Sequence, residues 1–119
     1  MKYLCQVWFD TAEINAISQE EGEELTRECI IYDNSVRDSG HLIIAQALRE
    51  PSTAVTVRVS NGKVAATDGP FAEIKEHLGG IILIDAKDMD EAIRIASGFP
   101  VIRYGCIEVR PAYSIQEED

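Results

Sequence analysis

The dipeptide Asn61-Gly62 constrains the fold of this chain more than any other feature, because only these two residues separate two strand-like segments, 55–60 and 63–67. Two-residue loops of this composition favour a type I′ turn, which fixes how the flanking strands pair. Residues whose numbers sum to 123 then face each other, so Val55 faces Asp68. Because side chains alternate between the two faces of a strand, Asp68 shares a face with the valines of the hairpin.

Asp68 also begins the segment Asp68-Gly69-Pro70-Phe71-Ala72-Glu73. A carboxylate that points at an apolar surface needs a partner, a ligand or a raised pKa, so we predict that Asp68 looks into the protein and acts as a general acid or base. An alternative is that Asp-Gly-Pro is ordinary turn chemistry, in which Asp bonds backbone amides and Pro occupies a first helical position. The motif would then be architectural.

The rest of the chain reads as strands and helices in alternation. Apolar residues recur with period two in the strands, and capping boxes at Ser18/Glu21 and Asp88/Glu91 open the two helices. The expected elements are a strand over 2–9, a helix from Ser18 to about 39, strands over 41–47 and 81–84, a helix from 89 to about 98, a strand over 104–110, and a short helical piece over 71–77. This order predicts an α+β fold, a ferredoxin-like βαββαβ frame with the hairpin inserted in its middle connection.

Such a frame carries both helices on one face of its sheet, yet the strands are apolar on both sides. Trp8 and part of the run 81–84 would form an exposed patch that monomers seldom carry. We therefore expect a second copy to cover this face in a two-fold homodimer.

Composition excludes several classes of protein. The chain has 21 acidic and 11 basic residues and a net charge of −10, which repels nucleic acids and anionic membranes. Its three cysteines have no CxxC spacing and are expected to be reduced core residues. No signal peptide and no run of about 18 apolar residues is visible, so we expect a cytoplasmic protein with no membrane partner. The chain is expected to form one domain over 1–113, followed by an acidic tail over 114–119.

Several side chains near the Asp68 segment could serve a site. On a helical turn, Glu73, Glu76 and His77 could gather near Asp68 to shuttle a proton, or they could be the hydrated first turn of a helix. No metal site is predicted, because a second spaced ligand of the usual kind is missing. The remaining candidates are Phe71 and Tyr32 as walls, Lys75 as a surface cation or ligand contact, and His41 as a proton carrier or helix-end residue. No Gly-rich phosphate loop or catalytic Ser-His pair is visible, and no cofactor is predicted.

The motifs DGPFAE, KE and LGG between 68 and 80, with Asp90-Glu91-Ala92 and Val109-Arg110-Pro111, resemble DGPF-domain proteins of the YCII-related superfamily. The resemblance covers nearly the whole chain and implies a dimeric α/β barrel of ferredoxin-like subunits. It implies little about activity, although similar proteins are sometimes encoded beside sigma factors. Related proteins have a proposed His/Asp acid-base pair, and the place of that His falls near Cys29, so this chain lacks it.

The leading hypothesis is a cytoplasmic dimer that binds a small organic molecule in a cleft between sheet and helices, near the DGPF turn. Asp68 would lie at its rim or floor, and His77 or His41 would be the other proton carrier. The alternatives are a non-enzymatic regulatory or interaction module and a purely architectural DGPF motif.

Overall fold

The computed structural model describes residues 1–71 and 75–115. Its elements are β1 (Lys2–Asp10), α1 (Thr11–Asn15), α2 (Gln19–Asp38), β2 (Leu42–Ala47), the 3-10 helix η1 (Pro51–Thr53), β3 (Val55–Ser60), β4 (Lys63–Asp68), β5 (Glu76–Asp85), α3 (Met89–Ser97), the 3-10 helix η2 (Pro100–Tyr104) and β6 (Gly105–Pro111). None of the helices in these two stretches is long and apolar enough to cross a membrane.

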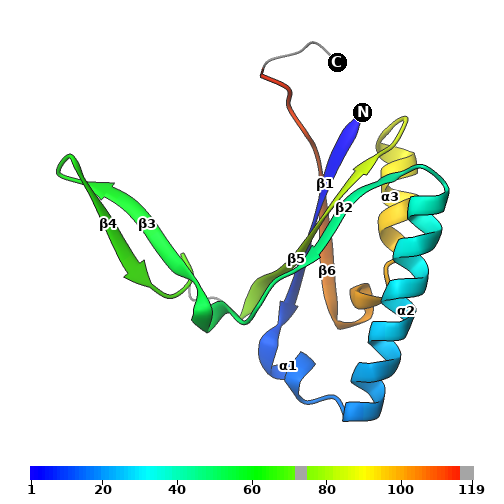
Figure 1. Ribbon diagram of the computed structural model, residues 1–119, viewed down its shortest axis with the longest axis horizontal. Helices are drawn as coiled ribbons and strands as arrows, with labels where there is room; N and C mark the ends of the chain where they lie inside the picture. Colours follow the sequence, from blue (N-terminus) through cyan, green and yellow to red (C-terminus); the bar gives the residue numbers. More distant parts are fainter. Residues whose placement is uncertain (72–74, 116–119) are drawn as a thin grey trace.

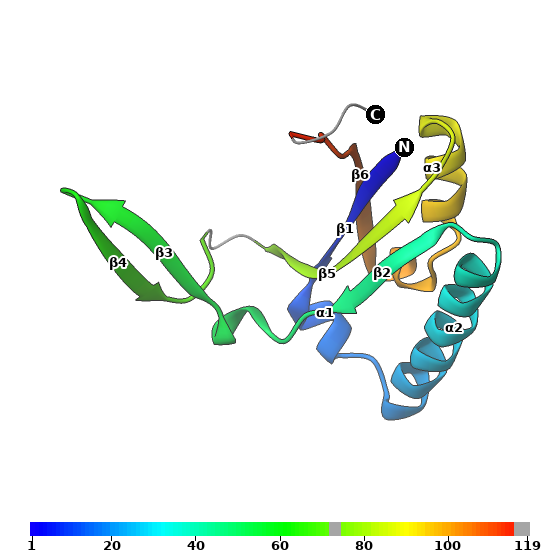
Figure 2. The same cartoon turned by 45° about the horizontal axis from the view of Figure 1, so that its top comes forward.

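Four strands form one antiparallel sheet in the order β2-β5-β1-β6. Helices α2 and α3 lie on the same side of this sheet, and within residues 1–71 and 75–115 the other side carries no α-helix (Figures 1 and 2). The hairpin β3-β4 lies in the connection between β2 and β5. This topology confirms the α+β architecture and is compatible with the predicted ferredoxin-like frame.

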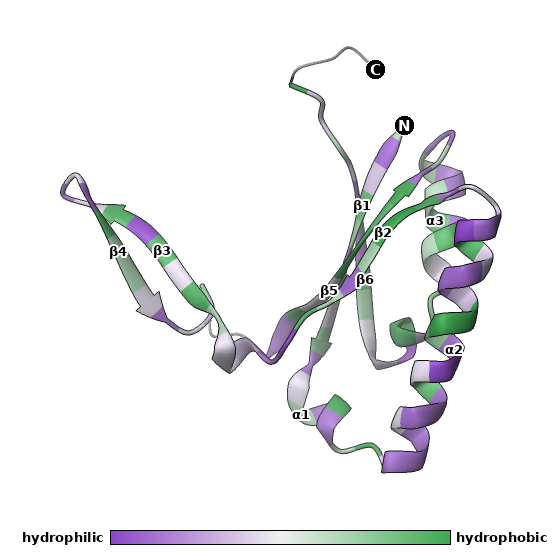
Figure 3. Cartoon of the chain, in the orientation of Figure 1, coloured by the Kyte–Doolittle hydropathy of each residue, from purple (hydrophilic) through white to green (hydrophobic). Residues whose placement is uncertain are grey.

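The core lies between the sheet and the helices because alternate strand residues point to that side. Its buried members are Tyr3, Cys5 and Val7 of β1, Ile82 and Ile84 of β5, Val36 of α2, Ala86, and Ala92, Ile95, Ala96 and Phe99 in and after α3. Figure 3 shows apolar residues along β2 and β5, and a mixture of hydrophilic and apolar residues along α2. Burial raises the pKa of the Cys5 thiol to about 11, so this cysteine stays protonated.

Both predicted capping boxes open their helices. The Ser18 hydroxyl accepts a hydrogen bond from the Glu21 amide at 3.1 Å, and the Asp88 carboxylate accepts one from the Glu91 amide at 2.9 Å. Tyr32 then joins the two helices, because its hydroxyl donates to the Ile95 carbonyl at 2.6 Å. The two helices are therefore bonded to each other in addition to packing on the sheet.

The short helix predicted over 71–77 is wrong where the structure describes it. Glu76 and His77 belong to β5, where they pair with Asp10 and Phe9 of β1. The sheet ladder extends five residues beyond the apolar run that signalled the strand, and its backbone bonds override the local helix-start pattern. The prediction for Glu73 falls on a residue outside the described part of the chain, as does the end of the acidic tail, 116–119.

The predicted hairpin register is confirmed. Val55 pairs with Asp68, and the turn residues Asn61 and Gly62 have φ values of 52° and 75°, as a type I′ turn requires. We call residues 55–68 the hairpin arm. The arm extends away from the rest of the molecule (Figure 1). The radius of gyration is 16.3 Å, against about 13.5 Å for a compact domain of this length.

The prediction that Asp68 looks into the protein is wrong for the single chain. Asp68 is exposed, and so is the whole face of the arm that it shares with Val55, Val57, Val59 and Val64. Strand parity places these side chains together, as expected, but parity does not determine whether anything covers their face.

Gly105 packs against the backbone of β1, which makes it a sharp test of the sheet. A Cβ atom at Gly105 would lie 1.9 Å from the Trp8 carbonyl oxygen, so we expect Gly105→Ala to lower the free energy of unfolding by about 1–3 kcal/mol. The control is Gly22→Ala in α2, where nothing approaches closer than 3.8 Å and a gain of about 0.5–1 kcal/mol is expected from helix propensity. Urea unfolding followed by circular dichroism measures both, and equal stability of the two variants would contradict this packing.

Candidate functional site

A large hollow lies where the hairpin arm joins the sheet, and we call it the turn hollow. Its volume is about 630 Å³, within the range of small-molecule sites. Its lining residues are Trp8, Leu48, Arg49, Glu50, Pro51, Thr53, Ala54, Pro70, Phe71, Glu76, His77 and Leu78. The hollow thus combines apolar and aromatic side chains with a few charged groups beside the DGPF turn. None of its lining residues comes from α2 or α3, so it is not the predicted cleft between sheet and helices.

A bulge in the pairing of β1 with β5 positions the sheet side of the turn hollow. Val7 pairs with Gly80, but the next residue, Trp8, pairs with Leu78, so Gly79 is the extra residue. The ring of Phe9 occupies the space above Gly79, where a Cβ atom would lie 2.2 Å from it. The bulge therefore brings Trp8 and Leu78 side by side at the hollow.

Phe71 lines the turn hollow, as predicted for a wall, from the side of the arm. The guanidinium of Arg58 lies 5.0 Å from the centre of the Phe71 ring, a cation–π contact with the polar face of the arm. The ring is 76% exposed in the single chain. Phe71 is therefore oriented by Arg58 while most of its surface is available to a ligand.

Of the titratable site candidates, Glu76 and His77 line the turn hollow, and His77 is the less exposed of the two. It is half-buried and lies opposite Phe9 on β1. A second, smaller hollow of about 180 Å³, beside α1, also includes His77. Its imidazole can accept or donate a hydrogen bond to a molecule at this place.

Two other candidates near the DGPF turn, Asp68 and Lys75, lie outside the turn hollow. Asp68 is exposed and is not among the lining residues. The ammonium group of Lys75 lies 3.8 Å from a carboxylate oxygen of Asp10 and is largely exposed. Lys75 therefore forms an ion pair at the surface, and neither Lys75 nor Asp68 lines the turn hollow.

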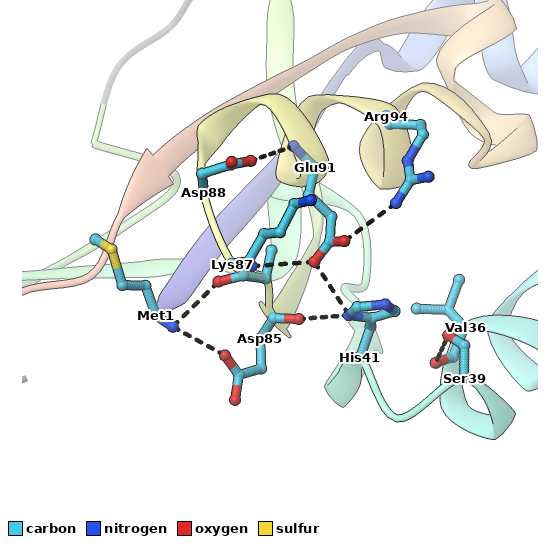
Figure 4. A network of polar contacts seen from close by, with 10 residues as sticks. Met1, Val36, Ser39, His41, Asp85, Lys87, Asp88, Glu91 and Arg94 are labelled. Atoms are coloured by element: carbon cyan, nitrogen blue, oxygen red, sulfur yellow. Dashed lines mark hydrogen bonds and ion pairs between the residues drawn. The ribbon is translucent and has the colours of Figure 1, made fainter.

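His41 lies at the opposite end of β2 from the turn hollow, within a polar network at the start of α3 (Figure 4). Its Nδ1 atom is 2.7 Å from the Asp85 carbonyl oxygen and 3.8 Å from a Glu91 carboxylate oxygen. Glu91 also accepts a hydrogen bond from the Lys87 amide and pairs with Arg94. His41 thus links β2 to α3 and is separate from the predicted ligand site.

A further cavity, which we call the inter-layer cavity, lies between α2 and the sheet. Its volume is about 300 Å³, and it shares Leu48 with the turn hollow. Apolar side chains dominate its lining, including Val7, Phe9, Ile82 and Phe99. Tyr32 was predicted as a wall of the cleft between sheet and helices, but it is not among the residues that line this cavity or the turn hollow.

Asp33, which was not among the predicted site residues, is the carboxylate that lines the inter-layer cavity together with Cys29 and Leu25. These three residues recur every four positions, so helical spacing places Asp33 on the same face of α2 as Leu25 and Cys29. Burial raises the pKa of Asp33, an effect that Arg37 partly offsets. Burial likewise raises the pKa of the Cys29 thiol, with a further contribution from Asp33.

Within residues 1–71 and 75–115, no three His, Cys, Asp or Glu side chains gather closely enough to hold a metal ion.

Comparison with known proteins gives two matches over nearly the whole chain. The family model of the YCII-related domain matches residues 1–116. An uncharacterized protein of Rhizobium meliloti (strain 1021) is 34% identical over 113 residues, which make up 93% of this chain and 91% of that protein.

The raised pKa of Asp33 predicts a pH-dependent stability. Between the ordinary and the raised pKa the folded protein binds more protons than the unfolded chain, so stability falls as pH rises through this window. We expect Asp33→Asn, which is neutral throughout, to have a higher Tm than the parent protein at pH 7 and no such advantage at pH 3. The control is Glu24→Gln, an exposed carboxylate of the same helix. Thermal unfolding at both pH values measures the difference, and an equal shift at pH 3 and pH 7 would contradict the assignment.

Proposed function

The chain belongs to the YCII-related family, and we propose that it works as a homodimer that binds a small organic molecule in the turn hollow. The observation that carries the ligand proposal is the hollow itself, about 630 Å³ in volume and bordered by Pro70 and Phe71 of the DGPF turn. Side chains normally fill a space of this size in a folded protein, because protein interiors are close-packed. A hollow that is left open therefore supports a ligand.

The lining of the turn hollow favours a ligand with a flat apolar body. Trp8 and Leu78 provide an apolar floor, and Phe71 provides a ring that can stack on the ligand. His77 is half-buried at the same place and can form the hydrogen bond that fixes the ligand's orientation. If a reaction follows binding, His77 carries the proton.

The homodimer is supported by the uncovered face of the sheet. Leu4 and Leu83 are opposite each other in the β1–β5 ladder, and Gln6 is opposite Ile81, all on the side away from the helices. Ile44 extends the apolar row onto β2 and is 48% exposed in the single chain. A second copy with the same face would bury both surfaces at once, as a two-fold interface requires.

The hairpin arm supports the same assembly. Its valines are 55–73% exposed, and an isolated two-stranded hairpin is only marginally stable in water. The arm carries Arg58, Lys63 and Asp68, a net charge of +1, whereas the remainder of the chain carries −11. The arm is therefore attracted to the acidic surface of another copy, while its apolar face gains from being covered.

Proton transfer by Asp68 requires the dimer. In the single chain Asp68 is exposed on the valine face of the arm. A partner that covers this face would desolvate the carboxylate and raise its proton affinity. The alternative function, a regulatory or interaction module, keeps the dimer but has no ligand. It predicts that a protein partner co-purifies with the chain and is lost at high salt, and that no small molecule is retained.

Ligand binding can be measured with N-phenyl-1-naphthylamine, a neutral probe whose fluorescence rises in apolar sites. Trp8 is the sole tryptophan of the chain, so a probe in the turn hollow receives energy from it directly. We expect Phe71→Ala to weaken binding about tenfold, since a buried aromatic contact contributes about 1.5 kcal/mol. The control is Tyr113→Ala, an exposed aromatic residue outside the hollow. Absence of energy transfer, or equal binding by both variants, would contradict the ligand proposal.

The role of the arm in the dimer can be tested with two neighbouring residues on opposite faces. Ala66 lies opposite Val57 on the valine face, and Ala65 lies opposite Arg58 on the polar face. We expect Ala66→Asp to raise the dissociation constant of the dimer at least 100-fold, because an unpaired charge resists burial. Ala65→Asp should change it little. Sedimentation velocity measures both, and a monomeric parent protein, or equal effects of the two changes, would contradict the assembly.

A further inference from the structure

We propose that the inter-layer cavity is a second binding site, separate from the turn hollow, for a small and mainly apolar molecule whose single hydrogen-bond donor is accepted by the Asp33 carboxylate. This site depends on neither the arm nor a second copy, because its lining comes from the sheet, α1, α2, Leu48 and the segment after α3 of one chain.

Small residues on the sheet create the space. Ala45 and Ala47 of β2 and Gly80 of β5 lie on the side of the sheet that faces α2, where β1 carries Val7 and Phe9. Side chains of ordinary size at these places would fill the gap between the layers. The volume of about 300 Å³ exceeds the 150 Å³ or so in which an engineered apolar cavity holds benzene.

The contacts that hold α2 leave the cavity open. Glu28 pairs with Arg103 at 2.6 Å, and Tyr32 bonds to the Ile95 carbonyl at 2.6 Å. Both contacts attach α2 to η2 and α3. The intervening stripe of the helix, Cys29 and Asp33, faces the cavity instead of closing onto the sheet.

Asp33 defines the chemistry of the ligand. In the two described stretches of the chain, no hydrogen bond or ion pair reaches its half-buried carboxylate. The nearby cation, Arg37, donates its hydrogen bond to the Asn34 side chain instead, at 2.7 Å. Arg37 acts on Asp33 only through its charge. A half-buried carboxylate without a bonded partner gains from a ligand hydroxyl or N–H group, and the surrounding Ile82 and Phe99 select an apolar body. Anionic ligands are repelled by Asp33.

The probes are 4-methylphenol and toluene, which have the same ring and methyl group and differ only in the hydroxyl donor. Each is titrated at pH 7 into ¹⁵N-labelled protein, and the amide shifts of residues 29 and 33 report binding. We expect 4-methylphenol to bind about three- to tenfold more tightly than toluene, the effect of one net hydrogen bond. The anion 4-methylbenzoate should not bind.

Three variants separate the contributions. Asp33→Leu should bind toluene at least as well as the parent protein and lose the preference for 4-methylphenol. Leu25→Trp should fill the cavity and abolish binding of both probes. The control is Asp38→Leu, an exposed residue of the same helix that does not line the cavity, and it should keep the full preference. If Leu25→Trp does not fold, Ala45→Phe fills the same space from the sheet side.

Cysteine alkylation gives an independent readout. Cys29 lines the cavity, whereas Cys106 lies opposite Trp8 on β6, on the side of the sheet away from the cavity, and serves as the internal reference. Saturating 4-methylphenol should slow iodoacetamide modification of Cys29 at least threefold and leave that of Cys106 unchanged. Equal affinity of the two probes, shifts that do not include residues 29 and 33, or unchanged Cys29 alkylation would overturn the proposal. Phe71→Ala should leave all these results unchanged, so failure at the turn hollow is distinguishable from failure here.

Discussion

The pairing of β1 with β5 is the interaction on which the rest of the molecule depends. It joins the two central strands of the sheet, and its register places Cys5 opposite Ile82 on the side of the helices and Leu4 opposite Leu83 on the other side. The single bulge in this ladder, at Gly79, decides which side chains border the turn hollow. Core packing, the uncovered face and the ligand space therefore all follow from one strand pair.

Local patterns in the sequence predicted the parts of the fold that local forces determine. The turn at Asn61-Gly62 fixed the hairpin register, and the residues Ser18 and Asp88 marked the starts of the long helices, because each rests on bonds between near neighbours. The beginning of β5 was not predictable in this way. His77 sits in a strand because Phe9, far away in the chain, pairs with it, and the sequence near His77 carries no sign of that contact.

The candidate site was predicted less well, for a related physical reason. Side-chain direction follows from strand or helix periodicity, whereas exposure depends on what lies opposite. Asp68 was placed on the correct face of the arm, but that face is uncovered in the chain. Asp33 was overlooked although helical spacing places it in line with Leu25 and Cys29, since a carboxylate among inward-facing residues is easily taken for a solvated one.

Two hydrogen bonds close the base of the hairpin arm. The Gly69 amide donates to the Ala54 carbonyl at 2.7 Å, and the Thr56 hydroxyl donates to the Gly69 carbonyl at 2.9 Å. Gly69 has a φ of 103°, a conformation that residues with a side chain rarely adopt. Since these contacts involve only the base of the ribbon, evolution can lengthen or shorten its tip without disturbing the sheet. Such changes must keep the alternation of side chains between the two faces of the arm. Removing one residue from each strand would move every apolar side chain beyond the deletion to the polar face, so only deletions or insertions of an even number of residues per strand are neutral.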